Sequence, residues 1–289
     1  MSRFLKLDVL FLGFLLITTI LLICSWRQTE NVVDLLIVRG VIFVVSLGFI
    51  FLNSILNSAV FNLFRNIYPI LLAGYFYTET VHYNKLFFDN LDPLFIQFDQ
   101  WLFGFQPSLT FSKYFSSAGF AELMYFGYFS FYCIILSFIF ITFFKRKSFF
   151  LESNFIVAFS LLFFYFIFAL FPSAGPQFYF DVSERAVPTN GYLFQKIIHA
   201  IQQGAEQPTG AFPSSHVGVT IVVLALSRKS SPLFFKICIP ITIILILSTV
   251  YIKAHYAVDA IFGFLIAPFI LYLAEFVYHY QPKKKIHIS

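Results

Sequence analysis

The chain has 289 residues, of which 59% are hydrophobic and 11% are charged, with a formal net charge of +5. Soluble globular proteins carry about 25% charged residues, so this composition excludes an ordinary soluble enzyme and indicates an integral membrane protein. The positive charge is expected to set the membrane topology and to attract anionic lipid head groups, and no nucleic-acid partner is expected.

Eight apolar stretches are candidates for membrane-crossing helices, each of which needs about 20 apolar residues. We therefore predict an all-α fold, a polytopic membrane helix bundle that forms a single integral membrane domain over 1–289. The predicted spans lie near Val9–Trp26, Leu36–Val60, Ile67–Val81, Leu123–Phe144, Asn154–Phe171, Pro213–Leu226, Leu233–Tyr251 and Ala257–Tyr278.

The cations predict the orientation of these spans, because short loops rich in lysine and arginine stay on the cytoplasmic side. The basic residues that fall on one side are Arg3, Lys6, Arg65, Lys145–Lys147, Arg228, Lys229 and Lys283–Lys285. Both termini are therefore expected in the cytoplasm, with the protein in the cell membrane. The long connections 84–122 and 172–212 are expected on the extracytoplasmic side.

Two short motifs, Phe212–His216 (FPSSH) and His255–Asp259 (HYAVD), stand at the ends of apolar stretches. The first begins the sixth span and the second follows the seventh, so both are expected at the extracytoplasmic face. His255 and Asp259 are four residues apart, which places them one turn from each other on one side of a helix. A carboxylate there can hold the tautomer of the imidazole. The two motifs therefore predict one reaction centre with His216, His255 and Asp259.

The Pro213–Ser215 turn is a candidate anion site. Proline suits the first position of a helix, and the Ser214 and Ser215 hydroxyl and backbone N–H groups then lie at the positive helix end, where a phosphate oxygen is favoured. Capping of the helix by Ser214 is an alternative that is compatible with this role. We predict Ser214 and Ser215 as substrate-binding residues.

These motifs resemble those of the type-2 phosphatidic acid phosphatase superfamily. The second motif of that family, Pro-Ser-x-His, matches Pro213–His216, and its third motif ends in His-x-x-x-Asp, which matches His255–Asp259. The resemblance implies a six-helix phosphatase-like core, here within 66–280, preceded by two N-terminal helices in 1–65.

The resemblance also implies the roles of the site residues. His255 would be the nucleophile that forms a phosphohistidine, Asp259 would orient it, and His216 would be the general acid for the leaving oxygen. No cofactor and no metal ion are expected, because fixed cations and amides meet the phosphoryl charge in that family.

The chain departs from the family in its cations. The first motif, Lys-x6-Arg-Pro, should follow the fifth span, where this chain has Phe171–Gln177 and neither cation, and Ser248–Thr249 stands where the third motif has Ser-Arg. We predict Lys253, one helical turn beyond Thr249, and then Arg185 as substrate-binding cations. Snorkelling of Lys253 to the membrane interface is an equal alternative.

The motif style is closest to the inositol phosphorylceramide synthase-like branch, and the specific resemblance covers 150–263. We predict a membrane lipid phosphatase that hydrolyses a lipid phosphate ester at the extracytoplasmic face through a phosphohistidine. The alternative is a lipid phosphotransferase that passes a phosphoryl-head group to an alcohol acceptor. A non-catalytic scaffold or transporter is a third hypothesis, against which the intact histidines and aspartate argue. The expected partners are a phospholipid or other lipid phosphate and the membrane.

Two features outside the motifs also carry predictions. In the second long connection, apolar residues recur at helical spacing, at Leu193, Ile197, Ile198 and Ile201. They predict a short amphipathic helix that either guides a lipid head group or packs against neighbouring helices. Arg39 and Glu79 lie within or at the edge of apolar spans, and the cost of inserting a charge makes them functional candidates.

Overall fold

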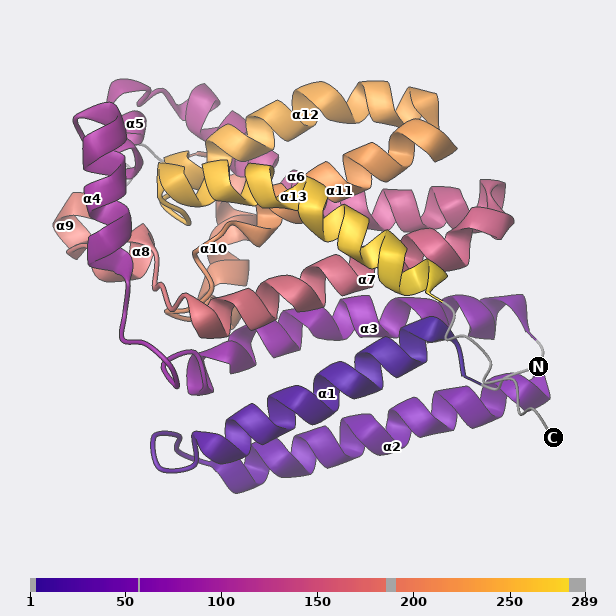
Figure 1. Ribbon diagram of the computed structural model, residues 1–289. Coiled ribbons are helices and arrows are strands. Elements are labelled where there is room, and N and C mark those ends of the chain that lie inside the picture. The colour runs from indigo at the N-terminus through magenta and orange to yellow at the C-terminus, as the bar shows by residue number, and fades with distance from the viewer. Residues whose placement is uncertain (1–3, 57, 186–190, 281–289) are drawn as a thin grey trace.

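The structure, a computed structural model, describes residues 4–56, 58–185 and 191–280. Every regular element in these residues is a helix, which confirms the predicted all-α fold. The long helices form a bundle, and the short helices α4, α5, α8, α9 and α10 gather at one end of it (Figure 1). The fold is therefore a helical bundle with a cap of short helices at one end.

The eight long helices correspond to the eight predicted spans. They are α1 (Lys6–Cys24), α2 (Val32–Leu56), α3 (Ala59–Glu79), α6 (Ala118–Lys145), α7 (Lys147–Leu170), α11 (Ser215–Ser230), α12 (Pro232–Tyr251) and α13 (Ala257–His279). The largest difference is in α3, which starts at Ala59 and not near Ile67, because the polar residues Arg65 and Asn66 are buried inside the helix.

Within the described residues, six of these helices are long and apolar enough to cross a membrane: α1, α2 over 32–53, α6, α7, α12 and α13. The chain is therefore an integral membrane protein. Helix α11 has 16 residues, fewer than the roughly 20 of a full crossing. Helix α3 is long enough but less apolar, since it contains Arg65, Asn66 and Glu79.

Helix α7 lies at the centre of the bundle. It packs against α3, α6, α11 and α13, and 78% of its apolar span is buried. Its Phe164 and Phe168 side chains are fully buried. Helix α11 also packs directly against α12 and α13, so the core holds α11 beside the junction of those two helices.

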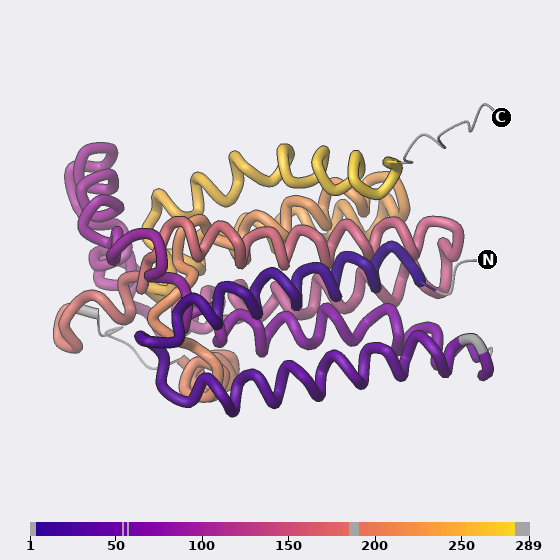
Figure 2. Tube along the Cα trace, turned by 60° about the horizontal axis from the view of Figure 1, so that its bottom comes forward, coloured from indigo at the N-terminus to yellow at the C-terminus, as the bar shows by residue number. Residues whose placement is uncertain are grey.

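The two ends of the bundle differ. Helix α1 begins and helix α13 ends at one end, and the short helices lie at the other, as two views show (Figures 1 and 2). Helix α4 packs against α13, and α5 packs against α12. The motifs at the start of α11 and at the α12–α13 junction therefore lie at the end that carries the short helices.

Those short helices occupy the two long connections. They are η1 (Thr80–His82), α4 (Asp92–Phe103), α5 (Pro107–Tyr114), α8 (Pro176–Tyr179), α9 (Val182–Arg185) and α10 (Leu193–Ala205). Helix α10 confirms the predicted amphipathic helix, and it packs against α6 with Ile198 fully buried. Helices α4 and α5 were not expected in the first connection, where the sequence predicted only a loop.

A buried ion pair joins α2 to α3. Arg39 Nε lies 2.9 Å from Glu79 Oε1, and an Arg39 Nη atom lies 2.5 Å from Glu79 Oε2. The other Nη atom donates to the Thr18 and Thr19 hydroxyls of α1 at 2.9 and 2.8 Å. The two charges that the sequence left without partners are therefore partners of each other, and they hold the first three helices together.

Candidate active site

The start of α11 is fixed by Ser214. Its hydroxyl caps the helix by accepting a hydrogen bond from the Val217 N–H at 3.4 Å, and its own N–H donates to the Asp259 carbonyl at 2.9 Å. A Cβ at Gly263 would lie 2.4 Å from the Ser214 carbonyl oxygen, so only glycine allows this close approach of α13. The starts of α11 and α13 are therefore locked together, with His216 in the first turn of α11.

His255 lies in the turn between α12 and α13. Its Nδ1 is 2.7 Å from the Ala211 carbonyl oxygen and 3.6 Å from Asp259 Oδ2. A carbonyl can only accept a hydrogen bond, so Nδ1 carries the proton of the neutral ring and Nε2 keeps a free lone pair. The Ala211 carbonyl makes the shorter contact, so it contributes more directly to the choice of tautomer than the Asp259 carboxylate does.

The two histidines face each other across a small cavity, with ring centroids 5.8 Å apart. His255 is 4% exposed, and this burial lowers the pKa of its imidazole to about 4. His216 lies between the rings of Tyr128 and Phe131, at centroid distances of 4.5 and 4.4 Å. The cavity thus holds one imidazole with a free Nε2 lone pair close to a second imidazole.

Two buried atoms of this site have no hydrogen-bond partner among the described residues, His216 Nδ1 and Asp259 Oδ1. Asp259 Oδ2 accepts from the Tyr256 N–H at 2.8 Å, so only one oxygen of that carboxyl is used. Buried polar atoms are normally paired. Both atoms are therefore available to a polar group that enters the site.

Helix α4 holds the α12–α13 turn in place through two aspartates. Asp99 accepts hydrogen bonds from the Ala257 and Val258 N–H groups, both at 2.9 Å, and so caps α13. Asp92 accepts one from the Tyr256 hydroxyl at 2.8 Å and also binds the N–H groups of the loop that follows α7. Burial raises the pKa of Asp99, against the effect of the two N–H groups. These carboxyl groups position the residues on both sides of His255.

The structure brings together most of the site residues that the sequence predicted. His216, His255 and Asp259 lie at one place, with Ser214 in the cap of α11 and Ser215 lining the cavity. The two remaining predicted residues are the cations Lys253 and Arg185. Lys253 directs its Nζ to the Ser112 hydroxyl of α5 at 2.7 Å, is 1% exposed, and does not line the cavity. The side chain of Arg185 lies outside the part of the chain that the structure describes.

Three side chains at the site were not predicted. Glu206 accepts hydrogen bonds from the Tyr128 hydroxyl at 3.3 Å and from the Gln177 side-chain amide. All three line the cavity of the histidines. The only signal in the sequence is the position of Glu206, a carboxyl in the short segment between an amphipathic helix and the FPSSH motif.

A groove of about 230 Å³ leads away from this cavity between α3, α6 and α7. His216, Ser215 and Glu206 lie at its inner end, and its walls are mostly aliphatic and aromatic. Leu71 at its outer end is 60% exposed on the surface of the bundle. His216 can therefore be reached from the side of the bundle.

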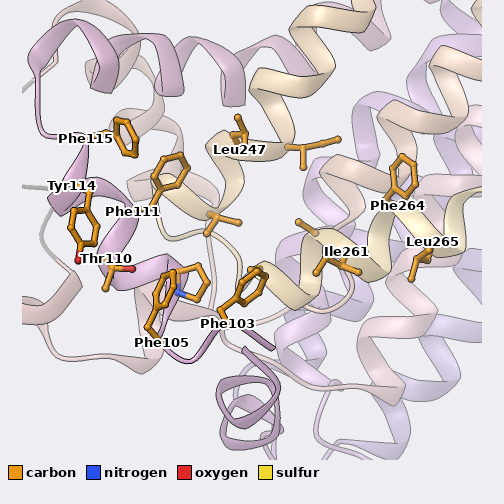
Figure 3. Close-up of a pocket in the computed structure, with 15 residues that line it drawn as sticks. Phe103, Phe105, Thr110, Phe111, Tyr114, Phe115, Leu247, Ile261, Phe264 and Leu265 are labelled. Carbon is orange, nitrogen blue, oxygen red and sulfur yellow. The ribbon is translucent and has the colours of Figure 1, made fainter. Parts of the chain in front are cut away.

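A second, larger groove of about 530 Å³ lies between α5, α12 and α13 (Figure 3). Phe103, Phe111 and Phe264 point into it, and its lining is almost entirely apolar. It shares no lining residue with the cavity of the histidines. It is an apolar surface groove beside the site and not a part of it.

Comparison with known proteins identifies the family. A family model described as PAP2 superfamily matches residues 94–273, which is more than half of the chain. No curated protein and no solved structure matches the chain. The match confirms the resemblance predicted from the motifs and extends beyond 150–263 to include α4, whose Asp99 caps α13. Within the described residues, no three histidine, cysteine, aspartate or glutamate side chains are grouped to hold a metal ion.

Proposed function

The chain belongs to the PAP2 superfamily, and we propose that it is a lipid phosphoesterase in which His255 is the nucleophile and His216 the general acid. The observation that carries this proposal is the pair of facing imidazoles, with His255 Nδ1 bound to the Ala211 carbonyl and Nε2 free. The membrane setting supports a lipid substrate, since six helices can cross a bilayer and a groove leads from His216 to the side of the bundle.

In the first step, His255 Nε2 attacks the phosphorus of the lipid phosphate ester. A nitrogen–phosphorus bond forms while the bond from phosphorus to the leaving oxygen breaks, and the leaving oxygen takes a proton from His216, which enters this step as the imidazolium and leaves it neutral. His255 Nδ1 keeps its proton, which is hydrogen-bonded to the Ala211 carbonyl. The carbonyl and the Asp259 carboxylate stabilise the positive charge that forms on the His255 ring. The product of this step is a phosphohistidine at His255.

In the second step, water or an alcohol attacks the phosphohistidine. His216 takes the proton of the attacking group, and the nitrogen–phosphorus bond breaks to restore both imidazoles. The enzyme returns to its starting protonation state, so no cofactor enters the sequence of steps. Water as the acceptor gives hydrolysis, and an alcohol gives transfer.

The phosphoryl oxygens would bind at the start of α11. The Ser214 hydroxyl and N–H and the Val217 N–H are already used in the cap, so the Ser215 hydroxyl and the N–H groups of Ser215 and His216 are left for an anion. Lys253 would reach a phosphate only if it left Ser112, and Arg185 would have to come from α9. We retain both as proposed contacts of lesser weight.

Transfer of a phosphoryl-head group is the second candidate function. It is favoured by the charge of the site, since no lysine or arginine of the described residues lines the cavity or the groove beside it. A phosphodiester carries one negative charge and a phosphomonoester up to two, so the diester needs fewer fixed cations. The motif style of the inositol phosphorylceramide synthase-like branch agrees with this candidate.

We also propose that the site faces the extracytoplasmic side. The basic residues Lys145, Arg146 and Lys147 between α6 and α7, and Arg228 and Lys229 near the end of α11, lie at the far ends of these helices from the site. Short basic loops stay in the cytoplasm. The membrane side is testable by the accessibility of cysteines introduced into α10 and the α6–α7 junction.

The experiment is an assay of the purified protein in lipid micelles, with phosphatidic acid and a set of phosphodiester lipids. Diacylglycerol, inorganic phosphate and head-group products are measured with and without an added long-chain alcohol. We expect diacylglycerol from at least one lipid, and its loss in His255→Ala. The matched control is His279→Ala, at the opposite end of α13, which should keep full activity. Unchanged turnover in His255→Ala would remove the proposed mechanism.

A further inference from the structure

The cavity beside His216 contains a carboxyl, that of Glu206, for which the proposed reaction has no role. Tyr128 donates its hydroxyl proton to Glu206 Oε1 at 3.3 Å, and its ring stacks on His216 at 4.5 Å. Gln177 donates to the other oxygen. A carboxylate has about four lone-pair sites, so these two hydrogen bonds leave room for a ligand. Tyr128 therefore contacts both Glu206, whose carboxylate can accept further hydrogen bonds, and the reacting His216.

Aromatic rings surround this carboxyl. Tyr77 and Glu206 line both the cavity of the histidines and the groove that leads from it. Tyr128 lines the cavity, and Tyr132 and Tyr165 line the groove. The faces of aromatic rings attract a cation within about 6 Å of the ring centroid, and cages of such rings bind alkylammonium groups. A carboxylate among tyrosines has the chemistry of an ammonium site.

The charge of the buried Glu206 carboxylate also favours a cation as its ligand. Burial raises the pKa of Glu206, while the hydrogen bonds from Gln177 and Tyr128 oppose this rise. A cation held against the carboxylate offsets the cost of burying its charge, whereas a second anion adds to that cost. In the described residues, no lysine or arginine reaches either cavity to do so. A cation for this carboxylate would therefore come from the substrate.

We propose that Glu206, together with the rings of Tyr77, Tyr128 and Tyr132, binds the ammonium group of a zwitterionic phospholipid. The substrate is then a phosphodiester with an amine-bearing head group, such as a choline or ethanolamine lipid. This inference rests on the proposed function, since it assigns the substrate class of the same site.

The proposal fits the steps at phosphorus. His255 Nε2 forms the bond to phosphorus, the bond from phosphorus to the glycerol oxygen breaks, and diacylglycerol leaves with the proton from His216. The phosphoryl-head group stays on His255 until water or an alcohol takes it. Because the head group remains in the site between the two steps, a site that holds its ammonium serves both of them.

The test uses lipids that share their acyl chains and differ only in the head group. Phosphatidylcholine, phosphatidylethanolamine, phosphatidylglycerol, phosphatidylinositol and phosphatidic acid are compared by the rate of diacylglycerol formation. We expect kcat/KM for the two ammonium lipids to exceed that for the other three by at least about tenfold. An equal or higher value for a glycerol, inositol or phosphomonoester lipid would overturn the proposal.

Glu206→Gln tests the residue itself, because it removes the charge and keeps the shape. The preference for ammonium lipids over phosphatidylglycerol, taken as the ratio of the two kcat/KM values, should fall by at least about tenfold. Tetramethylammonium chloride should compete with phosphatidylcholine in the wild-type protein and lose this effect in Glu206→Gln, with sodium chloride as the salt control. Glu184→Gln, in the exposed α9, is the matched control. Retained preference and retained competition in Glu206→Gln would contradict the assignment.

The outcomes separate this inference from the proposed function. Trapping of the phosphoryl group on His255 with anionic lipids alone would leave the proposed function standing and remove the ammonium site. Absence of any adduct and of any diacylglycerol, with all lipids and a folded protein, would remove both. A thermal unfolding curve for Glu206→Gln that overlays the wild type shows that a loss of preference is not a loss of fold.

Discussion

Two of the regions that bury polar and charged side chains differ in how those side chains are paired. Between α1, α2 and α3, both oxygens of Glu79 are bonded to Arg39, and the remaining Arg39 nitrogen is bonded to threonine hydroxyls. At the starts of α11 and α13, His216 Nδ1 and Asp259 Oδ1 have no partner among the described residues. The Arg39–Glu79 pair is therefore accounted for as a link between helices, whereas the two unpaired atoms at the starts of α11 and α13 are available to a ligand.

The largest effect expected from this difference is at His216. His216→Gln removes the group that protonates the leaving oxygen, so kcat should fall by about 10²–10⁴-fold. The free energy of unfolding should fall by only about 1 kcal/mol, from the lost ring contacts with Tyr128 and Phe131. Glutamine keeps most of the volume, and His216 Nδ1 has no partner among the described residues. The measurements are diacylglycerol formation and thermal unfolding in the same micelles. A fall in kcat of less than about fivefold would exclude His216 as the general acid.

In the N-terminal helices we expect a loss of stability without a loss of turnover. Arg39→Met leaves the Glu79 charge buried and unpaired, which should lower the free energy of unfolding by about 3–5 kcal/mol. The double variant Arg39→Met/Glu79→Leu should recover most of this loss, and the turnover per folded molecule should stay at the wild-type level in both. A double variant as unstable as the single one, or a specific loss of turnover, would show that the pair is more than a structural link.

A smaller effect is expected in the pH dependence of kcat/KM. Burial lowers the pKa of His255 to about 4, so its nucleophilic neutral form persists as the pH falls below the ordinary value of 6.5. Glu206 has a raised pKa, so it protonates first on acidification and binding of an ammonium lipid weakens. The titratable groups that line the same cavities as Glu206 come from five places: Tyr77 of α3, Tyr128 and Tyr132 of α6, Tyr165 of α7, His216 of α11, and His255 in the turn before α13.

The wild type should therefore lose kcat/KM for phosphatidylcholine at a higher pH than Glu206→Gln does, and the variant should keep its acid limb near pH 4. Initial rates between pH 3.5 and pH 8 measure both limbs, at roughly half-unit steps. Coincident profiles in the two proteins would contradict the role of Glu206, and an acid limb near 6.5 in the variant would contradict a buried, neutral His255.

The smallest effect on catalysis is expected at Lys253. Its Nζ binds the Ser112 hydroxyl of α5 outside the cavity, so Lys253→Met should change kcat/KM by less than about fivefold. It should lower stability by roughly 1–3 kcal/mol, because Ser112 is left buried without this partner. Lys236→Met, on the exposed face of α12, is the control. A much larger loss of kcat/KM would restore Lys253 as a contact of the phosphate.

Much of the fold could be predicted from the sequence, because length and hydropathy define a membrane span independently of its neighbours. The eight apolar stretches correspond to eight long helices. The spacing of His216, His255 and Asp259 predicted that these residues lie close together, as they do in the structure. Helix α10 was predicted by its periodicity. What these predictions share is that the signal is local in the sequence.

The parts that could not be predicted depend on distant contacts. Asp99 caps α13 although 158 residues separate it from Ala257, and no local pattern links the two. The partner of His255 Nδ1 is the carbonyl of Ala211, a backbone group that every residue type carries. Glu206 reaches His216 only through the ring of Tyr128 on another helix. Such contacts become visible only when the helices are placed side by side.

The most direct test of the account is the identity of the residue that carries the phosphoryl group. The protein is mixed with substrate lipid, quenched in alkali to protect a phosphohistidine, digested, and examined by mass spectrometry. The account predicts an adduct on His255 that is absent from His255→Ala and retained in His279→Ala. Turnover of the lipid with no adduct on His255, or with an adduct on another residue, would contradict it.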